Sequence, residues 1–210
     1  MKKSNITILK LLLWPLIQSL FITLSLCALT TLIVCLCCGK VFAQDKYPVS
    51  LSVGDKVPSL IWREQLTAVS VIGENTISLA DFKDKAIILD FWTSWCAPCL
   101  KNMPILDSIH RENNRDLKVI MMNASISRTG YDKEQKFIRQ FLTDHQNFFS
   151  PLTLRSDLYR KYFYFRVVPH YVWIGADGKV KALTDHTQFS KENISRFISG
   201  KSLSLTPKTQ

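Results

Sequence analysis

The strongest constraint on this chain is the segment Trp92–Cys99, Trp-Thr-Ser-Trp-Cys-Ala-Pro-Cys. It follows a nearly continuous apolar run over residues 86–91, which is typical of a buried strand, and it precedes an amphipathic run typical of a helix. Cys96 and Cys99 are therefore expected at a strand-to-helix junction, where the helix amides and dipole favour a thiolate at the first cysteine. Cys99 follows about one turn later, close enough to form a disulfide. The pattern predicts redox chemistry of the two thiols.

The first 43 residues have a different character. Residues 11–38 contain no charge. This run is longer than the roughly 7–15 residues of a signal-peptide core and than the roughly 20 that span a bilayer. Lys2, Lys3 and Lys10 precede it without a nearby acidic residue, which predicts a cytoplasmic N-terminus and export of the rest of the chain.

Two outcomes remain open for this segment. Val41-Phe42-Ala43 resembles a small-residue cleavage site, which favours a signal peptide removed near Ala43. The length of the apolar run favours an uncleaved anchor that crosses the membrane at residues 11–38. In either case we expect residues 44–210 on the periplasmic side of the cell envelope. A lipid anchor is not expected, because no cysteine of the segment follows a small residue.

The distribution of cysteines isolates the central pair. Four of the six are expected to act as small hydrophobic side chains within the apolar segment: Cys27, Cys35, Cys37 and Cys38. Only Cys96 and Cys99 remain in the exported part. A structural zinc site would need two further ligands, and the four histidines are widely separated in the sequence. We therefore expect no metal and no cofactor beyond a redox-active disulfide.

The charge pattern argues against a nucleic-acid partner. Four of the 27 basic residues lie in the first 43 positions, whereas all 17 acidic residues follow them. The remaining positive excess is modest, and it is dispersed rather than gathered into a run. A solvated surface is the expected role of these charges.

Residues 44–200 have the size of one domain. Two local features are specific: Gly73-Glu74-Asn75 predicts a hairpin turn, and Pro104 predicts a helix kink. The predicted elements are a hairpin over 60–79, a strand over 86–91, a helix over 96–113, a strand over 118–122, a helix over 132–145, a short helix after Ser156, a hairpin formed by 171–174 and 179–183, a helix from Ser190, and a frayed tail over 201–210.

Several motifs in this order resemble the exported thiol–disulfide oxidoreductases often called TlpA or ResA-like, in the thioredoxin superfamily. The resemblance runs from about residue 53 to 200 and implies an α/β thioredoxin fold, with a central mixed sheet flanked by helices and an N-terminal β-hairpin. The motifs are Phe91-Trp92-x-x-Trp95-Cys96-x-Pro98-Cys99, Pro104, Val168-Pro169, Asp177-Gly178-Lys179-Val180, Val53-Gly54-Asp55-Lys56-Val57-Pro58 and Ser78-Leu79-Ala80-Asp81-Phe82-Lys83.

The two cysteines have distinct expected roles. The Cys96 thiolate attacks a substrate disulfide to form a mixed disulfide, which Cys99 then resolves. Ala97 and Pro98 help to set the redox poise, and Pro98 removes an amide that could hold the thiolate. This dipeptide is similar to that of reducing thioredoxins, which favours a reductase. The electrostatic field of the surrounding residues also affects the stability of the Cys96 thiolate, so the dipeptide alone leaves an oxidising role open.

Asp90 is the candidate proton carrier. It interrupts the apolar strand, and a lone buried carboxylate tends to hold its proton. By resemblance it matches the buried aspartate of thioredoxins that relays a proton to or from the second cysteine. The alternative is a strand-end aspartate that faces solvent.

Substrate contacts are implied for a second loop. By resemblance Pro169 is cis and the backbone of Val168 offers strand-like hydrogen bonds to a substrate peptide; an ordinary trans proline is the alternative. His170 either tunes the thiolate or is a surface histidine. Trp92 is expected in the core, and Trp95 is expected to contribute to the substrate surface.

Together these features predict an envelope oxidoreductase that reduces protein disulfides. The resemblance implies that a membrane electron-transfer protein re-reduces it. A disulfide oxidase or isomerase is an alternative, and so is a non-enzymatic module that binds unfolded chains at Val168 and Pro169.

Overall fold

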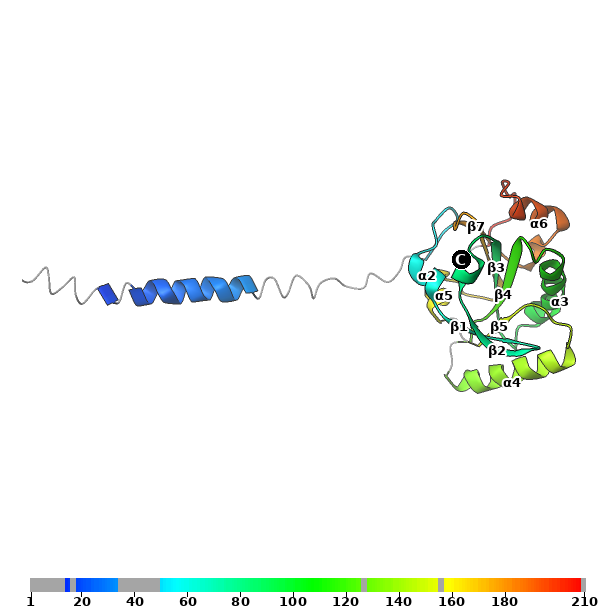
Figure 1. Cartoon of the computed structure of the whole chain (residues 1–210), viewed down its shortest axis with the longest axis horizontal. Coiled ribbons are helices and arrows are strands. Elements are labelled where there is room, and N and C mark those ends of the chain that lie inside the picture. The colour runs from blue at the N-terminus through cyan, green and yellow to red at the C-terminus, as the bar shows by residue number, and fades with distance from the viewer. Residues whose placement is uncertain (1–13, 16–17, 34–49, 126–127, 155–156, 209–210) are drawn as a thin grey trace, which may run out of the picture. The chain divides into compact units, whose positions relative to one another are not determined.

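The computed structural model describes residues 14–15, 18–33, 50–125, 128–154 and 157–208. The chain divides into two units, 1–47 and 48–210. In the first unit, residues 18–33 form a helix with exposed side chains, drawn in blue in Figure 1, and Cys27 on this helix is unpaired. Among the described residues, no helix has the length and apolar character needed to cross a bilayer. The predicted cleavage site at 41–43 lies outside the described residues.

The second unit is built on a seven-stranded sheet, and its mixed character is the one that the family resemblance implied. The strand order is β2-β1-β5-β4-β3-β6-β7. The central strands β3, β4 and β5 pair in parallel, and the strands on either side of them pair antiparallel. The strands are β1 Leu66–Ser70, β2 Gly73–Ile77, β3 Ala86–Trp92, β4 Leu117–Asn123, β5 Leu152–Thr153, β6 His170–Ile174 and β7 Val180–Thr184.

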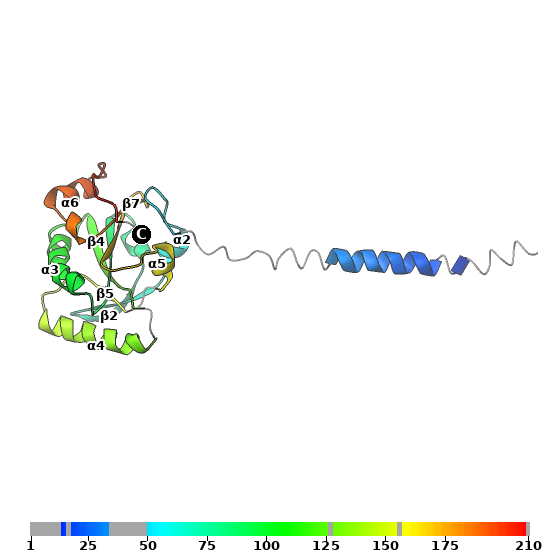
Figure 2. The same ribbon diagram turned by 180° about the vertical axis from the view of Figure 1, so that it is seen from behind.

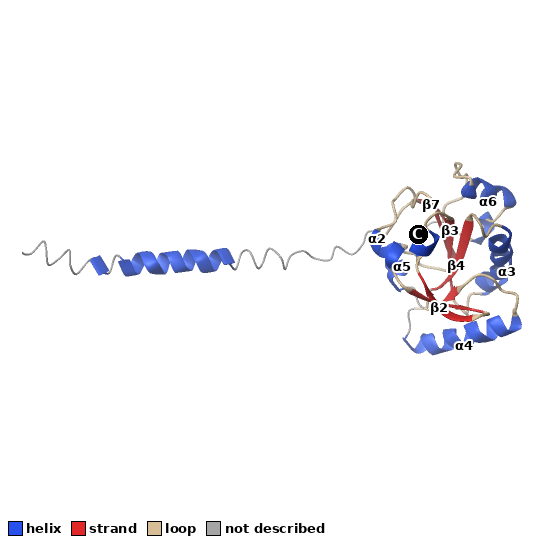
Figure 3. Ribbon diagram, in the orientation of Figure 1, coloured by secondary structure: helices blue, strands red, loops and turns tan. Residues whose placement is uncertain are grey.

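Helices cover both faces of this sheet, so the unit has three layers. One core cluster joins the sheet to α3, α4 and α6, and the other joins it to α2, η1 and α5. Figure 1 shows α3 and α6 on one side of the sheet and α2 and α5 on the other, and Figures 2 and 3 show the same arrangement from behind and by element type. The helical segments are α2 Ser59–Arg63, η1 Leu79–Phe82, α3 Ala97–Glu112, α4 Arg128–Asp144, α5 Asp157–Tyr162, η2 His186–Gln188 and α6 Lys191–Ile198.

Strand β3 lies at the centre because its residues suit burial on both faces. All seven are buried, as expected for a parallel strand with helices on either side. Successive side chains alternate between the faces. Ile88 and Trp92 therefore pack toward α3, whereas Leu89 and Phe91 pack toward α5. The same alternation brings Asp90 to the α3 face.

The predicted hairpin exists, but its turn was misplaced. The strands β1 and β2 are joined at Val71 and Ile72, and Gly73 is already paired with Ser70. Gly73 has a φ of 123°, which glycine adopts without a Cβ clash. Residues 60–63 belong to helix α2 rather than to an alternating strand. Helix α4 begins four residues earlier than predicted, and the two-residue strand β5 was not predicted.

The predicted helix around Pro104 is confirmed. Helix α3 continues through Pro104 from Ala97 to Glu112. The last helix is also confirmed, and the Ser190 side chain accepts a hydrogen bond from Asn193 N at its N-terminus. The Ser156 cap predicted for α5 lies outside the described residues.

The C-terminal residues differ from the frayed tail that we predicted. Leu203 and Leu205 pack against the α3-side core. Lys208 N donates a hydrogen bond to Leu183 O on β7 at 2.9 Å. Apolar contact and main-chain pairing therefore hold residues 203–208 against the domain.

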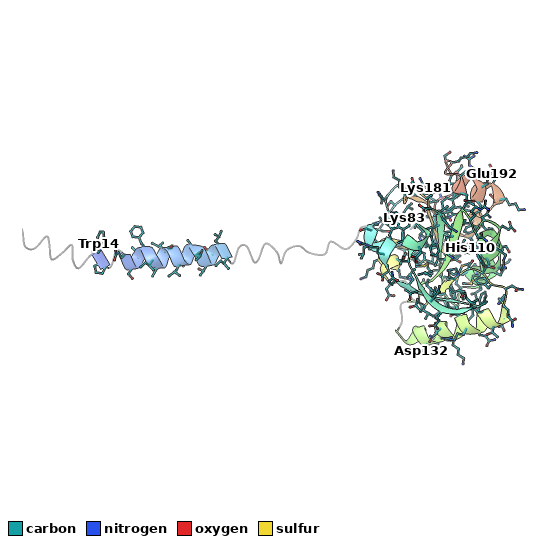
Figure 4. The ribbon with its side chains drawn as sticks, in the orientation of Figure 1. Trp14, Lys83, His110, Asp132, Lys181 and Glu192 are labelled. Carbon is teal, nitrogen blue, oxygen red and sulfur yellow. A yellow bond between two sulfur atoms is a disulfide. The ribbon has the colours of Figure 1, made fainter. Side chains whose placement is uncertain are left out.

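Charged side chains are spread over the surface of the second unit. Lys83, Asp132 and Glu192, labelled in Figure 4, lie exposed on three separate segments. His110, also labelled, is buried, and its Nδ1 lies 2.8 Å from Ser150 Oγ. The dispersal agrees with the solvated surface expected from the sequence.

Candidate active site

The two cysteines lie where β3 passes into α3, as the sequence predicted. Cys96 is the N-cap residue of α3, and Cys96 and Cys99 are joined by a disulfide with a Cα–Cα distance of 5.3 Å. Cys99 N lies 3.3 Å from Cys96 Sγ and donates to it. The unpaired amides of a first helical turn favour negative charge there, so this geometry stabilises a thiolate at Cys96 once the disulfide is reduced.

The surroundings of the two sulfurs differ. Cys96 is 4% exposed and Cys99 is fully buried. Ala97 and Pro98 are exposed beside Cys96, and the Trp95 side chain is 75% exposed. An incoming disulfide can therefore meet Cys96, whereas Cys99 is protected by the helix and the core. Trp92, in contrast, is fully buried, as predicted.

A second loop approaches the same end of β3. Phe91 lies opposite His170 in the antiparallel register, so the end of β3 lies beside the start of β6. The peptide bond between Val168 and Pro169 is cis, which confirms the expectation and rules out the trans alternative. Val168 packs against the cluster that contains both cysteines. Within the described part of the chain, its N–H and C=O have no hydrogen-bond partner.

Asp90 is buried on the face of the sheet that carries the cysteine pair. It is fully buried on the α3 face, so the solvent-facing alternative is wrong. Burial raises the pKa of its carboxyl well above the usual range, and the Tyr171 hydroxyl lowers this pKa by a smaller amount. Neither carboxylate oxygen has a partner in ordinary hydrogen-bond geometry among the described residues. Asp90 therefore favours its protonated form, as the sequence predicted for a lone buried carboxylate.

Two polar residues that sequence reasoning missed surround Asp90. Tyr171 lies opposite Asp90 in the β3–β6 register. Asn102 Nδ2 donates to Tyr171 Oη at 3.4 Å and to His186 O at 3.5 Å. An amide NH₂ only donates, so the phenol oxygen is the acceptor and its own proton remains available to Asp90. The alternation of β6 could have placed Tyr171 on this face.

His170 is not the surface histidine that was one alternative for it. It is fully buried, so it is not a surface histidine. It points to the opposite face of the sheet from the cysteines and stacks on Phe165, with ring centroids 4.8 Å apart. Burial, aided by the Lys208 cation, lowers its pKa to about 3. A neutral ring on the far face cannot act directly on the thiolate.

Glu134 is a further residue that the sequence did not single out. Its side chain is buried against the loop before Cys96. It accepts hydrogen bonds from Ser94 N at 3.2 Å, from Ser94 Oγ at 2.8 Å and from Asn123 Nδ2 at 2.9 Å. Helix α4 thereby fixes the active-site loop to β4. A glutamate in an amphipathic helix has no sequence signal that separates it from a surface residue.

Comparison with known proteins identifies the family. The family model described as Redoxin matches residues 52–194. The chain belongs to the Redoxin family. The chain is 30% identical over 97 residues to the thioredoxin-like protein YneN of Bacillus subtilis, covering 46% of this chain and 51% of the relative. It is 28% identical over 75 residues to the thiol-disulfide oxidoreductase ResA of Bacillus cereus, covering 35% and 39%. The chain thus spans about half the length, or less, of these curated relatives. The resemblance to ResA-like proteins is confirmed.

Solved structures confirm the thioredoxin fold of this chain. The thioredoxin domain of a thiol-disulfide oxidoreductase from Bacteroides vulgatus matches with a TM-score of 0.50 and 19% identity, over 72% of this chain and 98% of that domain. A secreted disulfide oxidoreductase of Mycobacterium tuberculosis matches with a TM-score of 0.51 and 16% identity, over 68% and 99%.

Proposed function

We propose that this chain is a thiol–disulfide oxidoreductase that reduces disulfides in proteins of the cell envelope. One observation carries the proposal: a cysteine pair caps the N-terminus of α3 beside a cis-proline loop whose Val168 main chain is unpaired. The pair supplies the electrons, and the loop supplies a main-chain edge on which an extended substrate can pair.

The reaction begins at the outer sulfur. In the reduced protein the Cys96 thiolate attacks one sulfur of the substrate disulfide. The substrate S–S bond breaks, a Cys96–substrate disulfide forms, and the other substrate sulfur leaves as a thiolate that takes up a proton. Cys96 keeps 4% exposure beside the exposed Ala97 and Pro98, whereas Cys99 has none, and this difference supports the order of events.

The second step releases the substrate. The Cys99 thiol gives its proton to the ionised Asp90 carboxylate, and the Cys99 thiolate attacks the Cys96 sulfur. The Cys96–Cys99 disulfide forms, the bond between Cys96 and the substrate breaks, and the substrate sulfur leaves as a thiolate that takes up a proton. Asp90 is the proton acceptor, because its raised pKa makes its ionised form a stronger base than an ordinary aspartate. Two electrons pass from the protein dithiol to the substrate disulfide.

A dithiol donor must then restore the reduced form. A membrane electron-transfer protein is the proposed donor, consistent with the ResA-like resemblance. The charge-free run at 11–38, with lysines before it, supports an envelope location on the periplasmic side. Ala97 and Pro98 between the cysteines favour reduction over oxidation.

A trapping experiment tests the proposal. Full-length Cys99→Ser protein lacks the resolving thiol, so it should accumulate mixed disulfides through Cys96 when it is expressed in cells and quenched with acid. The control, Cys96→Ser, should accumulate none. Mixed disulfides of equal yield in both variants, or their absence from Cys99→Ser, would instead favour a binding module in which the cysteines are incidental.

A further inference from the structure

The C-terminal residues 203–208, here called the strap, lie against the domain from α6 to the cis-proline loop. Leu203 and Leu205 are partly buried against the α3-side core. Thr206 N donates to Gln188 Oε1 at 3.2 Å, and Lys208 N donates to Leu183 O at 2.9 Å. These contacts fix the course of the strap before it reaches the loop.

The strap ends on the loop through one side chain. Lys208 Nζ donates to Val167 O at 2.6 Å and to Pro169 O at 2.5 Å. Hydrogen bonds from a charged donor are roughly twice as strong as neutral ones. A single ammonium group therefore holds the loop backbone at two points.

The two carbonyls lie on either side of Val168. The N–H and C=O of Val168 itself have no partner within the described ranges. Unpaired main-chain groups of this kind are what an extended peptide uses when it adds to a sheet edge. Lys208 thus fixes the flanking residues and leaves the Val168 main chain available to a ligand.

Exposed apolar side chains occur in this loop and before Cys96. Val167, next to Val168, is 62% exposed, and Trp95, next to Cys96, is 75% exposed. Both are large enough to cover the apolar side chains of a bound segment. The combination of an unpaired main chain and exposed apolar groups fits a polypeptide better than a small disulfide compound.

We propose that Lys208 is a positioning residue that holds the Val167–Pro169 backbone in the conformation that binds an extended polypeptide segment of the substrate. This inference rests on the proposed function, because the segment is the one that carries the disulfide to Cys96. A small disulfide needs only access to Cys96 and does not need the edge. Loss of the Lys208 contacts therefore impairs protein substrates selectively.

The test compares two substrates and three variants of the full-length protein in detergent. Lys208→Met removes the donors and keeps an apolar stem. Lys208→Arg keeps a charged donor. Lys201→Met is the matched control, because Lys201 is an exposed lysine at the start of the same C-terminal segment. Each protein is assayed for reduction of insulin and of oxidised glutathione, with dithiothreitol as the donor.

For Lys208→Met we expect kcat/KM with insulin to fall roughly tenfold, equivalent to about 1.4 kcal/mol, chiefly through KM. Its rate with oxidised glutathione and its Cys96–Cys99 reduction potential should remain unchanged. Lys208→Arg should recover most of the loss, and Lys201→Met should match the unmodified chain.

Three results would overturn this role of Lys208: an equal loss with both substrates, no loss with insulin, or a loss of the same size in Lys201→Met. Failure of the proposed function has a different signature, since the unmodified chain would then reduce neither insulin nor oxidised glutathione. The two failures are therefore distinguishable.

Discussion

At the scale of single residues, Asp90 connects the fold with the chemistry. The alternation of β3 directs its carboxyl to the face that carries Cys99, and the register of β6 brings Tyr171 opposite it. Burial raises its pKa, and the phenol opposes this effect weakly. The charge of Asp185 raises the pKa of Tyr171, and Asn102 donates a hydrogen bond to the Tyr171 hydroxyl. In the proposed mechanism, these neighbours affect the pH at which Asp90 can accept the Cys99 proton.

The change Asp90→Asn tests this role. The amide cannot accept the proton, so resolution of the mixed disulfide by Cys99 should slow by roughly 10²-fold or more. Stopped-flow measurement of a single turnover at pH 6 to 9 gives this rate. The exposed Asp84→Asn is the control. Unchanged kinetics across this range would contradict the role.

The same substitution should change the dependence of stability on pH. The pKa of the Asp90 carboxyl is higher in the folded protein than in the unfolded chain, where it is roughly 3.9. The contribution of this carboxyl to stability is fully present below the unfolded pKa. It is lost as the pH rises through the folded pKa. Asn has no such loss, so Asp90→Asn should gain stability relative to the unmodified chain as the pH rises. Denaturant titrations at several pH values measure the difference, and a difference independent of pH would count against the buried acid.

At the scale of elements, local patterns predict long segments and miss short ones. The apolar run of β3 and the stripe of α3 are each continuous in sequence, and both were predicted within about one residue. Helix α2 has five residues and β5 has two, too few for any period to be evident. The hairpin turn was misplaced because Gly73 carries its positive φ within β2.

The candidate site shows the same division. The sequence located Cys96, Cys99, Asp90 and the cis bond at Pro169 because each belongs to a local motif. Tyr171, Asn102 and Glu134 were missed because their roles depend on strand register or on contacts between distant segments. His170 was considered as a surface residue, but it is buried, and the alternation of β6 directs its side chain away from the cysteines.

Glu134 supports a prediction about the active-site loop. Glu134→Ala leaves the Ser94 amide without its Glu134 acceptor and removes the hydrogen bond from Asn123 Nδ2, so the free energy of unfolding should fall by about 1–3 kcal/mol. Denaturant unfolding of the oxidised protein measures the loss. Glu112→Ala, an exposed glutamate at the end of α3, should change stability by less than about 0.5 kcal/mol. Equal effects of the two changes would show that the Ser94 contacts contribute little.

At the scale of the whole molecule, the fold gathers distant parts of the chain at one end of the sheet. The cysteine turn follows β3, the cis-proline loop precedes β6, and the strap returns from the last helix to that loop. The cysteine turn lies at this end because it follows β3 directly in the sequence. The cis-proline loop and the strap reach it only through the tertiary structure. In the proposed mechanism, the reacting cysteines, the Val168 main chain that binds a peptide, and Lys208, which holds that loop, thus come from three separate regions.

The most direct test of the central claim is the reduction potential of the Cys96–Cys99 pair in the full-length protein, equilibrated against dithiothreitol or glutathione buffers. We predict a reduction potential near the roughly −270 mV of thioredoxin, because a reductase needs a lower reduction potential than the disulfides that it reduces. A value near about −120 mV would contradict the account, since it would indicate a protein that oxidises its partners.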